Sequence, residues 1–252
     1  MAGKSCTNNS VRKKINMKSV FHPSKERGHA NHGWLNAWHS FSFASWHDEA
    51  KVHFGLLRVL NDDTIAPGMG FGTHPHDNME IVTIPLSGVL EHKDSMGNIG
   101  QIKPGEIQAM SAGSGITHSE YNGSKTEETK LFQIWVFPKV KNITPRYEQI
   151  KFNVAERQNK FQTILSPVKS DKTMWINQDA FFTLGNFDKG YSSDYLIQHK
   201  GNGAYIMVIE GEIEIDGQTL SRRDAIGIWD TDKVSIKVNS NSELLVIDVP
   251  MN

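Results

Sequence analysis

Short apolar runs separated by turn-forming residues recur along this chain from Phe54 onward. Residues 54–60, 80–86 and 131–137 are three such runs, and each has the length of a β-strand. Gly, Pro, Asn and Asp lie between the runs, as they do between the strands of barrels and sandwiches. No long stretch shows the periodicity of an amphipathic helix. The pattern therefore predicts an all-β protein with little helix.

The pattern of the first half returns in weaker form in the second half. In residues 81–88 and again in 204–211, an apolar run ends at glycine, and a strand of alternating apolar and charged residues follows. Further on, residues 105–110 parallel residues 223–228. Self-similarity of this kind indicates a duplicated structural unit. We therefore predict two β-barrel domains in one chain, one for each copy.

The domain boundaries follow from changes in composition. Residues 1–16 are polar and lack a hydrophobic period, which predicts a disordered N-terminal extension. Two prolines and an asparagine interrupt the strand pattern in residues 138–145. We therefore place the first barrel in residues 17–140 and the second in residues 141–252.

Composition narrows the class of protein further. The chain has 252 residues and a formal net charge of -1, so it lacks the strong positive charge of a dedicated nucleic-acid binder. No apolar run approaches the roughly 20 residues that span a bilayer. The single cysteine, Cys6, excludes an intramolecular disulfide and suits a reducing compartment. We expect a cytoplasmic protein with no membrane span and no direct contact with nucleic acid.

Two short segments carry residue types that bind metal ions. His74 and His76 are two residues apart, as are His118 and Glu120. On a β-strand, residues two apart point to the same face. An isolated His-X-His pair is often an ordinary surface or core feature, but two pairs at strand spacing, each after a glycine-rich turn, favour a binding site. We predict that these four side chains hold one metal ion inside the first barrel.

The donor set constrains the metal without fixing it. Two imidazoles and a carboxylate match a non-haem Fe(II) site with open positions, whereas ligand type alone also permits Zn, Mn, Co, Ni or Cu. Gapless alignment of the two halves places Ile197, His199, Ile236 and Val238 at the corresponding four positions. Three of these are apolar, so we expect one transition metal ion per chain and a second barrel without metal.

The chain resembles the pirin family of the cupin superfamily from residue 17 to about residue 152, and its C-terminal part resembles the bacterial members more loosely. The matching segments are VFHP at 20–23, RG at 27–28, HSFSF at 39–43, the pair at 74 and 76, MEI at 79–81, GVLEHKDSMGN at 88–98, PGEIQ at 104–108, SAGSGITHSE at 111–120, QIW at 133–135 and PRYEQ at 145–149. The resemblance implies a bicupin of two jelly-roll barrels with metal, usually iron, only in the first. The ligands carry over onto His74, His76, His118 and Glu120.

Function is implied by the same resemblance. Some pirins show quercetin 2,3-dioxygenase activity, and residues 77–80 look like that bacterial branch. The implied reaction is ring cleavage of a flavonol by O2 at Fe(II), with a small aromatic or polyphenol substrate. Glu120, the one carboxylate of the set, is the candidate catalytic base. The alternative is an iron-dependent redox-sensing binding protein or transcriptional co-regulator with a protein partner and no turnover.

Several further residues stay open between structural and functional roles. Four apolar residues belong either to the barrel core or to the mouth of a substrate site, namely Met69, Phe71, Met79 and Met110. Three polar residues either lie on the surface or orient the ligands through hydrogen bonds, namely Glu80, His92 and Asp94.

Overall fold

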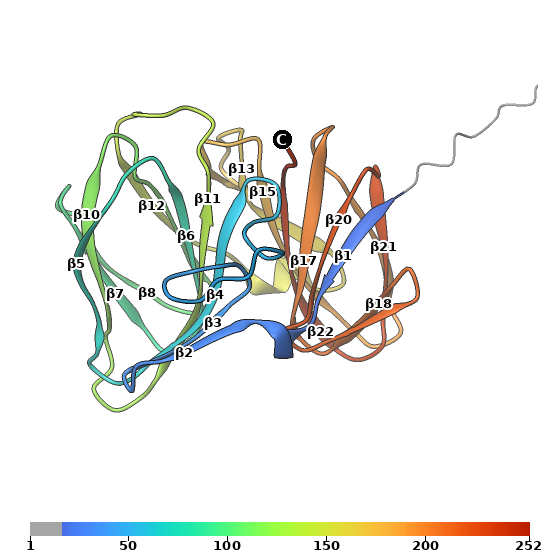
Figure 1. Ribbon diagram of the computed structural model, residues 1–252, viewed down its shortest axis with the longest axis horizontal. Coiled ribbons are helices and arrows are strands. Elements are labelled where there is room, and N and C mark those ends of the chain that lie inside the picture. The colour runs from blue at the N-terminus through green and yellow to red at the C-terminus, as the bar shows by residue number, and fades with distance from the viewer. Residues whose placement is uncertain (1–16) are drawn as a thin grey trace, which may run out of the picture.

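Two β-barrels lie side by side in the computed structural model, which describes residues 17–252 (Figure 1). The predicted disordered extension of residues 1–16 lies outside the described residues. The expectation of little helix is confirmed, because the described chain forms strands apart from two short 3-10 helices, η1 (Ser24–Glu26) and η2 (Val154–Arg157). Within residues 17–252, no helix is long and apolar enough to cross a membrane.

The first barrel consists of a seven-stranded sheet and a four-stranded sheet. The larger has the order β12-β9-β6-β11-β4-β3-β2 and the smaller the order β5-β10-β7-β8. The strands of the larger sheet are β2 (Gly28–Asn31), β3 (Leu35–His39), β4 (Leu57–Ile65), β6 (Glu80–Ser87), β9 (Glu106–Ser111), β11 (Thr129–Val136) and β12 (Arg146–Lys151). Those of the smaller sheet are β5 (Gly70–His76), β7 (Leu90–Asp94), β8 (Ile99–Ile102) and β10 (Ile116–Asn122).

The second barrel repeats this plan. Its larger sheet has the order β1-β20-β17-β22-β15-β13-β14 and its smaller sheet the order β16-β21-β18-β19. The strands of the larger sheet are β1 (Lys18–His22), β13 (Phe161–Ser166), β14 (Met174–Trp175), β15 (Phe181–Phe187), β17 (Asn202–Glu210), β20 (Ala225–Trp229) and β22 (Ser242–Pro250). Those of the smaller sheet are β16 (Ser192–Leu196), β18 (Glu212–Ile215), β19 (Gln218–Ser221) and β21 (Lys233–Val238).

The predicted duplication agrees with the strand order and with the turns. β6 and β17 hold equivalent places in their sheets, and each is followed by a glycine of positive φ, Gly88 at 77° and Gly211 at 93°. A Cβ at Gly88 would lie 2.5 Å from Thr129 Oγ1, so the turn needs glycine for space as well as for conformation. The second aligned pair, Gly105 and Arg223, also has positive φ in both copies.

One part of the gapless alignment is wrong. In the first barrel His74 lies opposite His118, and in the second barrel Ser193 lies opposite Ile236. Ser193 and Tyr195 therefore occupy the places expected for Ile197 and His199. The longer connection between β16 and β17, compared with that between β5 and β6, accounts for part of this shift.

The barrels exchange one strand each, as the crossing of β1 in Figure 1 shows. β1 pairs with β20 of the second barrel, and β12 pairs with β9 of the first. β1 and β12 occupy matching edge positions in their sheets. β1, which precedes residue 140, therefore lies in the second barrel, and β12, which follows residue 140, lies in the first. The domain boundary near residue 140 stays a prediction.

Successive residues of the larger sheets point to opposite faces, so one face packs between the two barrels and the other lines the inside of its own barrel. Side chains from both larger sheets form one shared apolar core, for example Phe132 and Ile134 of β11 with Phe182 of β15 and Ile247 of β22. The opposite face of the second barrel's sheet lines an apolar interior of its own. The back-to-back packing of the two larger sheets therefore joins the barrels through buried apolar surface.

The interior of the first barrel differs, because a polar layer interrupts its apolar residues. On β11, Leu131 belongs to one apolar cluster and Trp135 packs against another. Gln133 lies between them on the same face of the strand and is buried. Buried polar residues of the neighbouring strands share this level, including Asn61, Thr83 and Gln108. The polar layer gives the first barrel an interior that can take a charged group.

Candidate metal centre

The two predicted ligand segments lie on adjacent antiparallel strands. His74 of β5 faces His118 of β10 directly, and His76 faces Ile116. The imidazole centroids are 4.4 Å apart for His74 and His118, 4.9 Å for His76 and His118, and 4.8 Å for His74 and His76. One ring nitrogen of each histidine lies within 4.8 Å of the others, a spacing that can surround a single ion.

Glu120 points into the same interior as His118, because alternate residues of β10 are buried. The register with β5 shifts between His118 and Glu120, and Glu120 lies opposite His92 of β7. His92, His118 and Glu120 form a second group whose ligand atoms lie within 4.8 Å of one another. The structure therefore brings all four predicted residues into one interior, with His118 shared by both groups.

A chain of hydrogen bonds orients the Glu120 carboxylate. Gln133 Nε2 donates to Glu120 Oε2 at 2.8 Å, and Thr83 Oγ1 donates to Gln133 Oε1 at 3.1 Å. Gln108 Nε2 donates to Thr83 Oγ1 at 3.5 Å. Glu120 Oε1 is buried and has no partner among the described residues. One carboxylate oxygen is thus fixed by the barrel, while the other is free to bind a cation.

Two of the three histidines, His76 and His118, are held in the neutral form that metal binding requires. Burial and the neighbouring imidazoles lower the pKa of His118 to about 3 and that of His76 to about 4. Both rings are therefore neutral near pH 7 and keep a lone pair for a metal ion. His74 Nδ1 lies 2.8 Å from the Gly72 carbonyl oxygen and donates to it, so its Nε2 is the ring nitrogen left to face the other two histidines.

Buried polar atoms without a protein partner show that this interior fits a cation. Both ring nitrogens of His118 and one oxygen of Glu120 are buried without a partner among residues 17–252. Burial raises the pKa of Glu120 to about 7, despite the hydrogen bond from Gln133. Native proteins leave few such groups unpaired, and a nearby cation favours an ionised carboxylate. The donor set therefore fits a divalent transition metal ion.

His92 is one of the three polar residues that the sequence left open between the surface and the ligands. It is 1% exposed, with Nδ1 unpartnered and Nε2 3.3 Å from Asp94 Oδ2. Asp94 is itself held by Asn98, whose side-chain amide donates at 2.8 Å. Alternation along β7 points residues 90, 92 and 94 inward. The pairing of β7 with β10, which the sequence does not give, is what puts His92 beside Glu120.

Of the other residues that the sequence left open, some have structural positions and some line cavities. Glu80 is not part of the histidine cluster, because its Oε2 accepts hydrogen bonds from Ser111 and from the Asn177 backbone. Met110 is buried in an apolar cluster, and Met69 is 44% exposed. The two remaining apolar candidates, Phe71 and Met79, line cavities beside the histidines.

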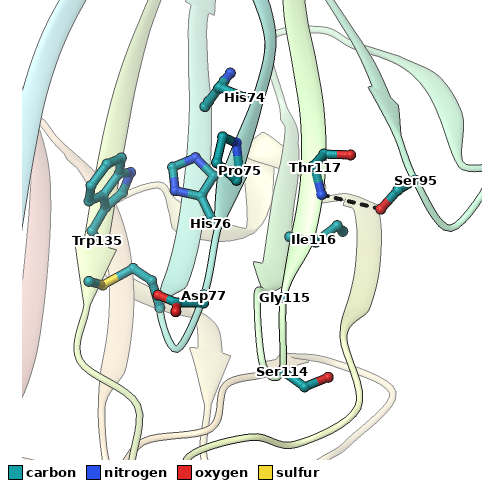
Figure 2. Close-up of a pocket in the computed structure, with 11 residues that line it drawn as sticks. His74, Pro75, His76, Asp77, Ser95, Ser114, Gly115, Ile116, Thr117 and Trp135 are labelled. Atoms are coloured by element: carbon teal, nitrogen blue, oxygen red, sulfur yellow. Dashed lines mark hydrogen bonds between the residues drawn. The ribbon is translucent and has the colours of Figure 1, made fainter.

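Two cavities meet at the histidine cluster. The outer cavity has a volume of about 1010 Å³ and opens to solvent between the ends of β5 and β10. Figure 2 shows His76 in its wall, between Trp135 on one side and Ile116 and Thr117 on the other. A smaller inner chamber of about 190 Å³ lies on the other side of His74, His76 and Trp135, which line both spaces. A ligand near the histidines can therefore extend in two directions.

These observations define a two-barrel cupin with a nitrogen- and oxygen-rich centre in its first barrel. Comparison with known proteins agrees with this class. The Pirin family profile matches residues 20–136, and the profile for the quercetinase C-terminal cupin domain matches residues 163–249. The crystal structure of the bacterial pirin YhhW from Escherichia coli in complex with nickel(II) superposes with a TM-score of 0.87 and 45% identity, covering 92% of this chain and 99% of that one.

Curated relatives agree over the same length. Quercetin 2,3-dioxygenase of Escherichia coli K12 is 46% identical over 227 residues, which cover 90% of this chain and 96% of the relative. The pirin-like protein of Caulobacter vibrioides is 39% identical over 90% of this chain and 97% of its own length. The chain belongs to the pirin family.

Proposed function

We propose that this protein is a metal-dependent dioxygenase that cleaves the central ring of flavonols with O2, as a quercetin 2,3-dioxygenase does. The observation that supports the proposal most strongly is the convergence of three imidazoles and one partly unpaired carboxylate beside two cavities. The name of the 46% identical Escherichia coli relative supports the same activity. The substrate class is a small aromatic polyphenol.

The proposed ligands are His74, His76, His118 and Glu120, and the proposed resident metal is Fe(II). A bound divalent ion lowers the pKa of a coordinated hydroxyl and activates the bound flavonol toward dioxygen. Nickel is the metal named for the Escherichia coli pirin structure, and the same donor types accept both ions. A cytoplasmic location stays a prediction.

Glu120 is the proposed catalytic base. Its Oε2 is held by Gln133, so its Oε1 is the oxygen left both to face the cation and to take the proton of the substrate hydroxyl. Burial raises the pKa of this carboxyl to about 7 in the metal-free chain, and a bound cation would favour its ionised form, which is the form that accepts a proton. The ring then opens with incorporation of both oxygen atoms of O2 and release of carbon monoxide.

The competing hypothesis is a binding protein that senses iron redox state and acts on a protein partner. It uses the same ligands, but it does not need a substrate cavity. The outer cavity and inner chamber that meet at the histidines favour an enzyme.

The two functions are separated by one experiment. The protein is purified without oxygen, stripped of metal, and reloaded with Fe(II), Ni(II) or Zn(II). Dioxygen uptake is then followed with quercetin and with a panel of smaller enediols. We expect uptake that depends on the metal and on the polyphenol. Metal loading without uptake on any member of the panel would support the binding protein.

A further inference from the structure

Asp63 is a buried carboxyl group that the proposed chemistry does not use. It lies on β4 between Ala37 of β3 and Leu131 of β11, and it is 3% exposed. Its Oδ1 is buried and has no hydrogen-bond partner among residues 17–252. The two residues opposite it are apolar, so the strands themselves offer no side-chain donor at that level.

The inner chamber is where Asp63 meets open space. Asp63 lines it together with Glu120 and with three aromatic side chains, those of Phe43, Phe71 and Trp135. The indole Nε1 of Trp135 is also buried without a partner among the described residues. An apolar, aromatic chamber with a few unpaired polar atoms has the composition of a site for an aromatic ligand that carries polar substituents.

The size of the chamber limits what it can hold. Pockets for drug-sized ligands measure about 300–1,000 Å³, whereas this chamber measures about 190 Å³. It can accept one aromatic ring but not a complete flavonol. His74, His76 and Trp135 also line the outer cavity, so the two spaces adjoin at these residues, and we place the rest of the ligand in the larger space.

We infer that the inner chamber is a ring-binding subsite in which Asp63 determines specificity, by forming a hydrogen bond with a hydroxyl group on the pendant ring of the polyphenol substrate. This inference rests on the proposed function and names the part of the substrate that this chain selects. A carboxyl oxygen accepts a hydrogen bond from a phenolic hydroxyl whether the acid is ionised or not. Asp63 is neither a proposed metal ligand nor the proposed base, so we expect it to act on substrate binding and not on the chemical step.

Two substitutions and two flavonols test the subsite. Asp63→Leu replaces the polar atoms with methyl groups in a side chain of the same branched shape, and Asp63→Asn keeps an acceptor and serves as the matched control. Quercetin carries hydroxyl groups on its pendant ring, whereas galangin has none there. In the wild type we expect KM for quercetin to be about tenfold below that for galangin, as one hydrogen bond can supply. Asp63→Leu should bring the two KM values within about twofold, while Asp63→Asn should keep most of the difference.

Further readouts separate a subsite from a structural role. We expect kcat and metal content to be unchanged in both variants. We also expect the melting temperature of Asp63→Leu not to fall, because an unpaired buried carboxyl is replaced by an apolar group. Equal preference for quercetin in Asp63→Leu and wild type would overturn the inference. So would a loss of metal, or an equal fall in kcat on both flavonols.

The failure of the proposed function would be visible separately. If metal-loaded wild-type protein turns over neither flavonol, the dioxygenase proposal fails, and the subsite is read from the dissociation constants of the same two compounds. A quercetin preference that disappears in Asp63→Leu would still support the subsite. Equal binding of quercetin and galangin by the wild type would exclude it.

Discussion

Glu120 presents its two carboxylate oxygens to different surroundings. Oε2 accepts a hydrogen bond from Gln133, whereas Oε1 is buried and unpaired. Glu120→Gln keeps the size of the side chain and one oxygen but removes most of its basicity. We predict that turnover per bound metal falls by about a hundredfold to ten-thousandfold, the usual contribution of a general base. The measurement is the quercetin rate under air divided by metal content. An unchanged ratio would mean that Glu120 is at most a ligand.

His76 tests the proposed ligand set against an ordinary histidine. His76→Ala should lower metal affinity by more than the roughly 10–100-fold that loss of an outer partner costs. His199→Ala is the matched control, because His199 is exposed and lies in the turn before β17. Elemental analysis should find one ion per chain in the wild type and the control, with loss in His76→Ala. Full occupancy in His76→Ala would refute the ligand set, and loss in the control would refute a metal-free second barrel.

At the scale of elements, Glu80 joins the start of β6 to the second half of the chain. Its Oε2 accepts hydrogen bonds from Ser111 Oγ at 2.8 Å and from the backbone N–H of Asn177 at 3.1 Å. Burial raises the pKa of Glu80 to about 7, and these hydrogen bonds offset only part of the rise. The native state therefore prefers the protonated acid, so the stability that this preference contributes is present at low pH and is lost as pH rises through the folded pKa.

The difference in the free energy of unfolding between wild type and Glu80→Gln should therefore depend on pH, because the glutamine side chain does not titrate. We predict that the free energy of unfolding of metal-free wild type, relative to the variant, falls by about 1.4 kcal/mol per pH unit within the window from about pH 5 to about pH 7. Urea unfolding at several pH values measures it. A constant difference across this window would show that Glu80 is already ionised in the native state.

Sequence patterns were sufficient to predict the strands but not to predict which strands pair with each other. Glycines with positive φ at 88 and 211 mark equivalent turns, so the duplicated strands could be predicted. The exchange of β1 and β12 could not, because both are short edge strands whose partners lie far away in sequence. The same limit applies to His92 and Asp63. Alternation indicates that each points inward, but only the strand register places them beside Glu120 and the inner chamber.

At the scale of the whole molecule, two barrels with one plan have different interiors. The second barrel places Ile236 and Val238 on β21 inside an apolar cluster, at the places that His118 and Glu120 occupy in the first. The shared core between the larger sheets holds the two barrels together. The apolar packing of the second barrel thus stabilises a chain whose first barrel has unpaired polar atoms around its centre. Such atoms lower stability unless a ligand satisfies them.

The central claim is that the first barrel performs metal-dependent cleavage of a flavonol ring, and its most direct test is a carbon balance. Metal-loaded wild type and His118→Ala are incubated with quercetin and O2, and the carbon monoxide released is measured against the quercetin consumed. The account predicts about one carbon monoxide for each quercetin and each O2 in the wild type, and none above background in His118→Ala. Quercetin loss without carbon monoxide, or equal release by His118→Ala, would contradict it.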